Sequence, residues 1–164
     1  MPDPATIDPP LSARDPRLAP WRAFVRAQAH VQRRLDEDLR SEHGLSLQEY
    51  VALLILAEAP NRMLRMGRLA ESLTLSKSGA TRLIDRLVDD GLVARHSCSS
   101  DARGAEASLT ERGLDRLRTA APTHLRGIAD YFLAAIGTDD LPTIERTMHS
   151  VAACAGARED HAKS

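Results

Sequence analysis

The chain has 164 residues and a formal net charge of −1, with 43% hydrophobic, 27% charged and 3% aromatic residues. This composition excludes a disordered tail, and no apolar run approaches the roughly 18 residues that span a bilayer. The two cysteines lie far apart, which argues against a disulfide framework or a thiolate zinc site and favours a reducing, cytoplasmic compartment. The few aromatic side chains argue against a sheet that stacks RNA bases.

The N-terminal part of the chain divides into a leader and two predicted helices. Residues 1–17 are rich in proline and are expected to be an extended leader, without the apolar run of a signal peptide. Residues 21–43 repeat apolar side chains every three or four positions, which predicts a long amphipathic helix. Ser46 and Glu49 have the spacing of a capping box, so a second, largely buried helix is expected to begin there and to end before Pro60.

The middle of the chain has the pattern of two helices joined by a tight turn. Residues 63–65 are expected to form a small strand, residues 67–73 a short helix, and residues 76–90 a longer helix capped by Ser76. One side of the longer helix carries an apolar stripe, made of Ala80, Leu83, Ile84, Leu87 and Val88. Because its other side is polar and basic, the segment predicts a helix-turn-helix.

A β-hairpin and further helices are expected after the helix-turn-helix. Residues 92–96 and 105–109 alternate like strands and flank a long polar loop, so they predict a hairpin, or wing. Thr110 is expected to cap the next helix, which Pro122 is expected to kink or interrupt. In the last helix, residues 141–155, apolar side chains recur at alternating steps of three and four, a spacing typical of a helix that packs against another helix.

Two sequence motifs occur together in this region. The wing reads Asp101-Ala102-Arg103-Gly104, and Leu109-Thr110-Glu111-Arg112-Gly113 follows it. The helix-turn-helix before them runs from Leu69-Ala70-Glu71 through Ser76-Lys77-Ser78-Gly79-Ala80-Thr81-Arg82 to Gly91-Leu92-Val93. In this order and spacing the segments resemble the MarR (multiple antibiotic resistance regulator) family of winged helix-turn-helix repressors. The resemblance is close over residues 46–113 and extends in architecture over residues 21–155.

The resemblance implies a fold and a domain organisation. The fold would be mainly α with a small β-hairpin wing, a winged helix-turn-helix flanked by N- and C-terminal dimerisation helices. Residues 18–157 would form a single domain, with the DNA-binding lobe at 46–113, the helical dimerisation region at 18–44 and 114–157, and a flexible tail at 158–164. The first and last helices also have apolar faces beyond what the lobe can bury. This favours a homodimer, the alternative being that these helices pack only within their own chain.

The charge of the chain is unevenly distributed. Between positions 62 and 104 there are eight basic and five acidic residues, a net charge of +3, while the rest of the chain carries −4. A surface that faces phosphate groups needs such an excess of positive charge. The residues expected to contact double-stranded DNA come from the longer helix, the strand before it and the wing, and they are Arg65, Ser76, Lys77, Ser78, Thr81, Arg82, Arg86, Arg95, Asp101 and Arg103.

The resemblance assigns roles within this set. The longer helix would be the recognition helix in the major groove, and Arg103 would enter the minor groove, the alternative being a loop arginine paired only with Asp101. Many relatives carry a second arginine where this chain has Ala102, so its wing is expected to hold the DNA backbone with one charge fewer. Cys98 lies in the wing beside His96, and an inert thiol is favoured there over a redox role.

Other classes of function have weaker support. The six histidines show no metal-ligand spacing and no nucleophile motif occurs, so no metal site, cofactor or catalysis is expected. The resemblance implies a small effector, often aromatic or phenolic, whose crevice Trp21, His30, Tyr50 and His124 could line, although core packing explains each equally well. The predicted function is a ligand-responsive repressor that binds a pseudo-palindromic operator as a homodimer. The alternative is a winged-helix module that binds a protein partner.

Overall fold

The computed structural model describes the backbone of residues 11–97 and 105–162, and the side chains of residues 11–96 and 105–155. The chain divides into two compact units, Met1–His124 and Leu125–Ser164. The tip of the wing, with Cys98, Asp101 and Arg103, lies outside the described residues. Within the described ranges, no helix combines the length and the apolar character that crossing a membrane requires.

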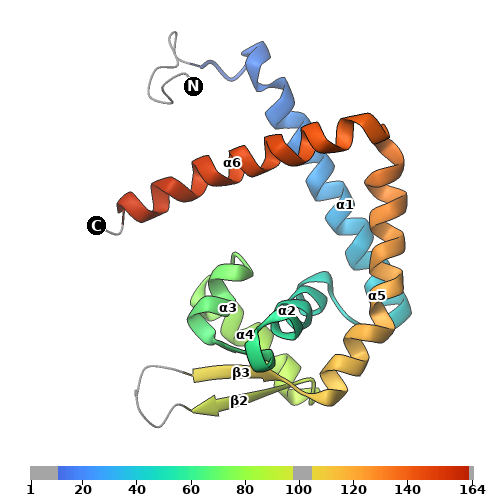
Figure 1. The fold of residues 1–164 in the computed structure, drawn as a ribbon, viewed down its shortest axis with the longest axis vertical. Coiled ribbons are helices and arrows are strands. Elements are labelled where there is room, and N and C mark those ends of the chain that lie inside the picture. The colour runs from blue at the N-terminus through green and yellow to red at the C-terminus, as the bar shows by residue number, and fades with distance from the viewer. Residues whose placement is uncertain (1–10, 98–104, 163–164) are drawn as a thin grey trace. The chain divides into compact units, whose positions relative to one another are not determined.

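The first unit holds the predicted helix-turn-helix and a small sheet (Figure 1). Its helices are α1 (Ala19–His43), α2 (Leu47–Glu58), α3 (Met66–Ser72), α4 (Lys77–Asp89) and the greater part of α5 (Glu111–Tyr131). Its strands are β1 (Met63–Arg65), β2 (Val93–Ser97) and β3 (Ala105–Leu109), and short 3-10 turns lie at η1 (Pro16–Leu18) and η2 (Pro60–Arg62). The predicted mainly α fold with a small β element is confirmed.

The sheet has three antiparallel strands in the order β1-β3-β2. The hairpin of β2 and β3 is the predicted wing, and Arg95 pairs with Ala107 across it. The short strand β1 adds to the other edge of β3, where Leu64 pairs with Ala107. Because β1 leads directly into α3, this pairing fixes the start of the helix-turn-helix against the wing.

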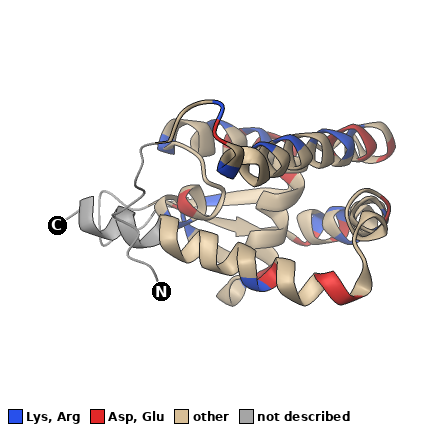
Figure 2. Cartoon of the chain, turned by 90° about the horizontal axis from the view of Figure 1, so that it is seen from above, with Lys and Arg blue, Asp and Glu red and all other residues tan. Residues whose placement is uncertain are grey.

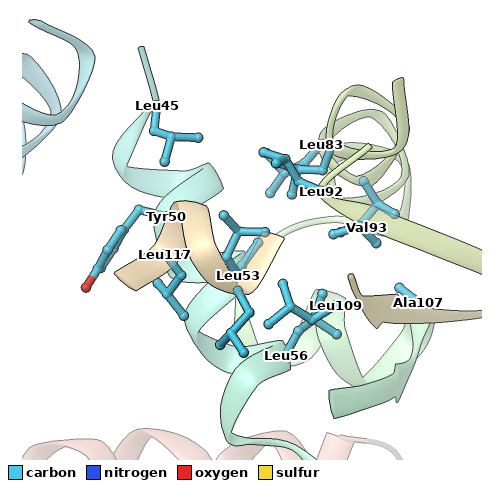
Figure 3. Packing of buried hydrophobic residues seen from close by; sticks show 14 of the residues in the cluster. Leu45, Tyr50, Leu53, Leu56, Leu83, Leu92, Val93, Ala107, Leu109 and Leu117 are labelled. Atoms are coloured by element: carbon cyan, nitrogen blue, oxygen red, sulfur yellow. The ribbon is translucent and has the colours of Figure 1, made fainter. Parts of the chain in front are cut away.

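The core of the first unit is built around α2, which is apolar on nearly every side. Leu53 and Leu56 of α2 are fully buried. Side chains from α4, the sheet and α5 converge on them, among them Leu83, Leu92, Val93, Ala107, Leu109 and Leu117 (Figure 3). Burying a leucine side chain contributes about 1.5–3 kcal/mol. The helix α4 is therefore held by apolar contacts on its inner face, and its outer face is left for other contacts.

The junction of α1 and α2 contains a glycine that ends α1 and the predicted capping box, which is confirmed. Gly44 has φ 63°, a conformation that favours glycine, and its N–H bonds to the Arg40 carbonyl oxygen at 2.9 Å to end α1. Ser46 then caps α2, since its Oγ accepts from the Glu49 N–H and the Glu49 carboxylate accepts from the Ser46 N–H. The chain can thus reverse between two helices without leaving their end groups unbonded.

The Leu-Thr-x-x-Gly motif holds the start of α5 against the loop that follows α4. Thr110 Oγ1 donates to the Gly91 and Leu92 carbonyl oxygens at 2.9 and 3.0 Å, and it accepts from the Gly113 N–H at 2.9 Å. A Cβ at Gly113 would collide with the Leu92 carbonyl oxygen and lie 2.7 Å from Leu109 Cδ1. Glycine is therefore required by close approach of the backbone, and the motif joins the loop after α4, the end of β3 and the start of α5.

Pro122 does not interrupt α5, contrary to one of the two expectations for it. The helix runs through Pro122 to Tyr131, and η3 (Leu133–Ala135) follows it. Contacts next to the proline hold the helix in place: Thr123 is buried and hydrogen-bonded to His43 and Glu42, and His124 stacks on Tyr50. These tertiary contacts offset the backbone hydrogen bond that proline removes.

The second unit consists of the end of α5, two short 3-10 turns and α6. The turn η4 (Thr138–Asp140) leads into α6 (Leu141–Ala162). Large apolar side chains are exposed in this unit, namely Leu125, Phe132, Leu133, Met148 and Val151. A single copy of the chain therefore leaves much of the predicted apolar seam of α6 uncovered.

Candidate nucleic-acid interface

The helix α4, the expected recognition helix, has one buried and one exposed face. Its N-cap is Ser76, whose Oγ accepts from the Gly79 N–H at 3.1 Å. The inner face is buried at Ala80, Leu83, Ile84 and Leu87, as the apolar stripe predicted. The outer face is exposed and carries Lys77, Ser78, Thr81, Arg82, Asp85 and Arg86. This face offers positive charge and hydroxyl groups on a rigid helix, which is what a helix in the major groove requires.

The turn between α3 and α4 is tight and conformationally strained. The Leu75 N–H bonds back to the Ala70 carbonyl oxygen at 3.0 Å, and the Thr74 N–H to the Glu71 carbonyl oxygen at 3.0 Å. Thr74 has φ 54°, a left-handed conformation that β-branched residues rarely adopt. The turn places the two helices of the motif at a fixed angle and exposes the N-terminal end of α4.

The hydroxyl groups at the start of α4 are partly engaged within the helix itself. Ser76 Oγ lies 3.2 Å from Ser78 Oγ, and Thr81 Oγ1 donates to the Lys77 carbonyl oxygen at 2.9 Å. The hydroxyl oxygens keep lone pairs that can accept from an exocyclic amine of a base. Lys77, at the first position of the helix, is exposed beside them.

The candidate basic residues differ in whether they have an acidic neighbour. Three of the arginines have one: Arg65 with Glu106 at 3.9 Å, Arg86 with Glu49 at 3.3 Å, and Arg95 with Asp85 at 2.9 Å. Within the described part of the chain, Lys77 and Arg82 make no ion pair. We expect these two cations to supply more of the attraction for phosphate than the paired arginines.

A hollow lies where the helix-turn-helix meets the wing. It has a volume of about 300 Å³ and is lined by Met66, Gly67, Lys77, Thr81, Arg95 and Ala105. Lys77 and Arg95 come from elements separated in sequence and are brought to one recess by the pairing of the hairpin with β1. The recess is positively charged and belongs to the same surface as the outer face of α4.

The structure brings together two of the four residues proposed to line an effector crevice. The rings of Tyr50 and His124 are 4.4 Å apart between centroids, and Tyr50 is buried. Burial raises the pKa of the Tyr50 hydroxyl and lowers the pKa of His124. Trp21 instead packs on Phe24 and is 60% exposed, and His30 lies beside Arg33 on α1.

Sequence reasoning missed the acidic partners of the candidate arginines. From sequence, Glu49 is expected only in the capping box, and nothing singles out Asp85. Both pairs join residues from different elements, so no local spacing reveals them. Basic and acidic residues are interspersed along the helices (Figure 2), and this distribution does not predict which of them form ion pairs. Among the described residues there is no cluster of three or more His, Cys, Asp or Glu side chains that could hold a metal ion.

The fold defines a winged helix-turn-helix protein, in which the outer face of α4 is polar and exposed. A sequence model of the MarR family matches residues 43–104. The chain is 30% identical over 113 residues to the uncharacterized HTH-type transcriptional regulator YkoM of Bacillus subtilis, covering 68% of this chain and 71% of that protein. It is 33% identical over 86 residues to the HTH-type transcriptional repressor YetL of the same organism, covering 52% of each.

The fold of a solved structure agrees with these matches. Sco3205, a MarR family transcriptional regulator from Streptomyces coelicolor crystallised in complex with DNA, superposes with a TM-score of 0.78 at 31% identity. The alignment covers 87% of this chain and 88% of that one. The chain belongs to the MarR family of transcriptional regulators, and the resemblance drawn from the helix-turn-helix and wing motifs is confirmed.

Proposed function

We propose that the protein is a sequence-specific repressor that binds a pseudo-palindromic operator in double-stranded DNA as a homodimer and responds to a small effector. The observation that carries this proposal is the outer face of α4, where Lys77 and Arg82 are exposed without an ion pair in the described residues. The complex of Sco3205 with DNA and the repressor YetL support it by family relationship. The protein would act in the cytoplasm and catalyse no reaction.

The residues proposed for DNA contact would form one surface on the lobe. Ser76, Lys77, Ser78, Thr81, Arg82 and Arg86 would lie along the major groove, with Arg65 and Arg95 beside them. Arg103 would enter the adjacent minor groove, with Asp101 bracing the wing. We expect Arg103→Ala to weaken operator binding by about 1–3 kcal/mol without altering the assembly state.

The proposed homodimer would bury apolar side chains that a single chain leaves exposed. On α1 the side chains of Trp21, Phe24 and Val25 are 60%, 42% and 40% exposed, and further apolar groups are exposed in the second unit. One recognition helix buries too little surface for tight and specific binding, so two are needed. The effector would be aromatic or phenolic, as the family resemblance implies, with the Tyr50–His124 ring pair as the part of its site that is assembled within one chain.

Selection of bound sequences from fragmented genomic DNA tests this function. We expect the protein to retain short duplexes that share a pseudo-palindrome, and footprinting to show half-site centres about 10 bp apart. Retention of no duplex at low salt would contradict DNA binding. Copurification with a protein partner, and with no DNA, would favour the winged-helix interaction module instead.

A further inference from the structure

Hydrogen bonds connect the long helix α1 to the first turn of α2. Asp36 on α1 accepts from the Leu47 N–H at 2.8 Å through Oδ1, and its Oδ2 lies 2.6 Å from Arg40 Nε. Leu47 is the first residue of α2, so its N–H has no partner within that helix. A side chain of α1 thus supplies the hydrogen bond that the start of α2 lacks and fixes the two helices together.

A second carboxylate continues this connection from α2 to the recognition helix. Glu49 accepts from the Ser46 N–H at 2.8 Å through Oε2 and from Arg86 Nε at 3.3 Å through Oε1. Its side chain is only 15% exposed, whereas that of Arg86 is 56% exposed. Burial alone would raise the pKa of Glu49, but the hydrogen bonds from Ser46 and Arg86 outweigh it and keep the pKa below its ordinary value. The carboxylate is therefore charged whenever DNA is bound at neutral pH.

The contact fixes one edge of the Arg86 guanidinium and leaves the rest of it accessible. Only Nε bonds to Glu49, and the terminal nitrogens make no hydrogen bond within the described residues. A planar guanidinium held along one edge presents its other donors in a defined direction, which favours a two-point contact with a phosphate or a guanine. Near DNA, an acidic residue that served no such purpose would only oppose binding.

We propose that Glu49 is a positioning residue for DNA binding, which orients Arg86 and, through the first turn of α2 and Asp36, sets the recognition helix against α1. This inference rests on the proposed function, because it assumes that the outer face of α4 binds an operator and that α1 contacts the second copy. In a dimer, the position of α4 relative to α1 determines the separation of the two recognition helices. Glu49 would therefore influence the preferred spacing of the half-sites as well as affinity.

The substitution Glu49→Gln tests the proposal, because glutamine can still complete the capping box but cannot form the ion pair. Removing a negative charge near DNA should by itself raise affinity. Loss of positioning predicts the opposite sign: operator affinity falls by about threefold to tenfold, with the salt dependence unchanged. Glu71→Gln is the matched control, since Glu71 pairs with Arg68 within α3 at 3.5 Å and joins no two elements. We expect the control to bind as tightly as the unmodified protein or more tightly.

Two further measurements distinguish positioning from a general loss of stability. Combined with Arg86→Met, Glu49→Gln should cause no additional loss of affinity, because the group that it orients is gone. On operators with one base pair inserted between the half-sites, Glu49→Gln should discriminate less against the altered spacing than the unmodified protein does.

The outcomes separate this inference from the function on which it rests. If the unmodified protein binds its operator and Glu49→Gln binds it equally well or better, with the same spacing preference, the inference is wrong and the function stands. If the unmodified protein binds no duplex, the proposed function itself fails.

Discussion

Arg95 of β2 and Asp85 of α4 form an ion pair, with Nη2 and Oδ1 2.9 Å apart. It connects the wing directly to the recognition helix, on the side that the proposed function turns toward DNA. Asp85 places a negative charge on the face that must approach phosphate groups. Arg95 neutralises that charge, so the contribution of Arg95 to DNA binding depends on the presence of Asp85.

The first prediction concerns this dependence. Arg95→Gln should weaken operator binding by about 1–3 kcal/mol, because it removes a cation and leaves Asp85 uncompensated. In the Arg95→Gln background, Asp85→Asn should restore part of the lost operator affinity. This gain in affinity should be larger than the gain that Asp85→Asn causes in the otherwise unmodified protein. Fluorescence anisotropy with a labelled operator measures the four affinities. Equal effects of Asp85→Asn in both backgrounds would show that the pair is not coupled to binding.

The second prediction concerns the strained turn of the helix-turn-helix. Thr74 has φ 54°, where glycine has no steric penalty. A left-handed residue costs about 1–2 kcal/mol, which exceeds the entropic cost of glycine in the unfolded chain. Thr74→Gly should therefore raise the free energy of unfolding by about 0.5–1 kcal/mol. Thr74→Ala, which keeps the Cβ, is the control and should not stabilise the protein in a urea titration.

The third prediction compares two glycines. A Cβ at Gly113 would collide with the Leu92 backbone, whereas a Cβ at Gly67 would meet no atom within 4 Å. We expect Gly113→Ala to lower the free energy of unfolding by about 1–3 kcal/mol, because the start of α5 must move away from the loop after α4. Gly67→Ala, in α3, should leave stability unchanged or raise it by up to about 1 kcal/mol. Thermal unfolding of both variants checks which is less stable. Similar melting temperatures would contradict the close approach of Gly113 to the Leu92 backbone.

The fourth prediction follows from the burial of His124. Burial lowers the pKa of His124 below its ordinary value of 6.5. Between these two pKa values the unfolded chain binds more protons than the folded one, so stability falls as the pH falls through about 6.5 and levels off below the folded-state pKa. His124→Phe keeps a ring against Tyr50 and should remove this part of the pH dependence. Urea titrations between pH 8 and pH 5 measure the pH dependence of stability, and His149→Phe on exposed α6 is the control. If His124→Phe has the same pH dependence as the unmodified protein, His124 does not cause it.

The helices and the hairpin could be predicted because their signals are local. The Ser46–Glu49 capping box, the Ser76 cap and the apolar stripe of α4 each depend on residues within one or two turns. Gly113 belongs to a motif recognised from sequence, yet its reason, contact with the Leu92 carbonyl, needs the fold. Continuous passage of α5 through Pro122 also depends on tertiary contacts, those of Thr123 and His124 with α1 and α2.

The composition of the candidate site could be predicted, but its internal pairing could not. The excess of basic residues between positions 62 and 104 identified the surface, and the exposed face of α4 agrees with it. Which arginines are neutralised depends on long-range contacts of Glu49 and Asp85 that no spacing encodes. The division into paired arginines and the two cations without an ion pair among the described residues, Lys77 and Arg82, is therefore visible only in the structure.

The salt dependence of operator binding tests the central claim most directly, with the unmodified protein compared with Arg82→Ala. If the outer face of α4 binds DNA, the logarithm of the affinity falls linearly with the logarithm of the salt concentration, and Arg82→Ala reduces the slope by about one. Arg118→Ala, which removes an exposed arginine of α5, is the control and should leave the slope unchanged. Equal affinity and equal slope for Arg82→Ala and the unmodified protein would contradict the assignment of this face to DNA.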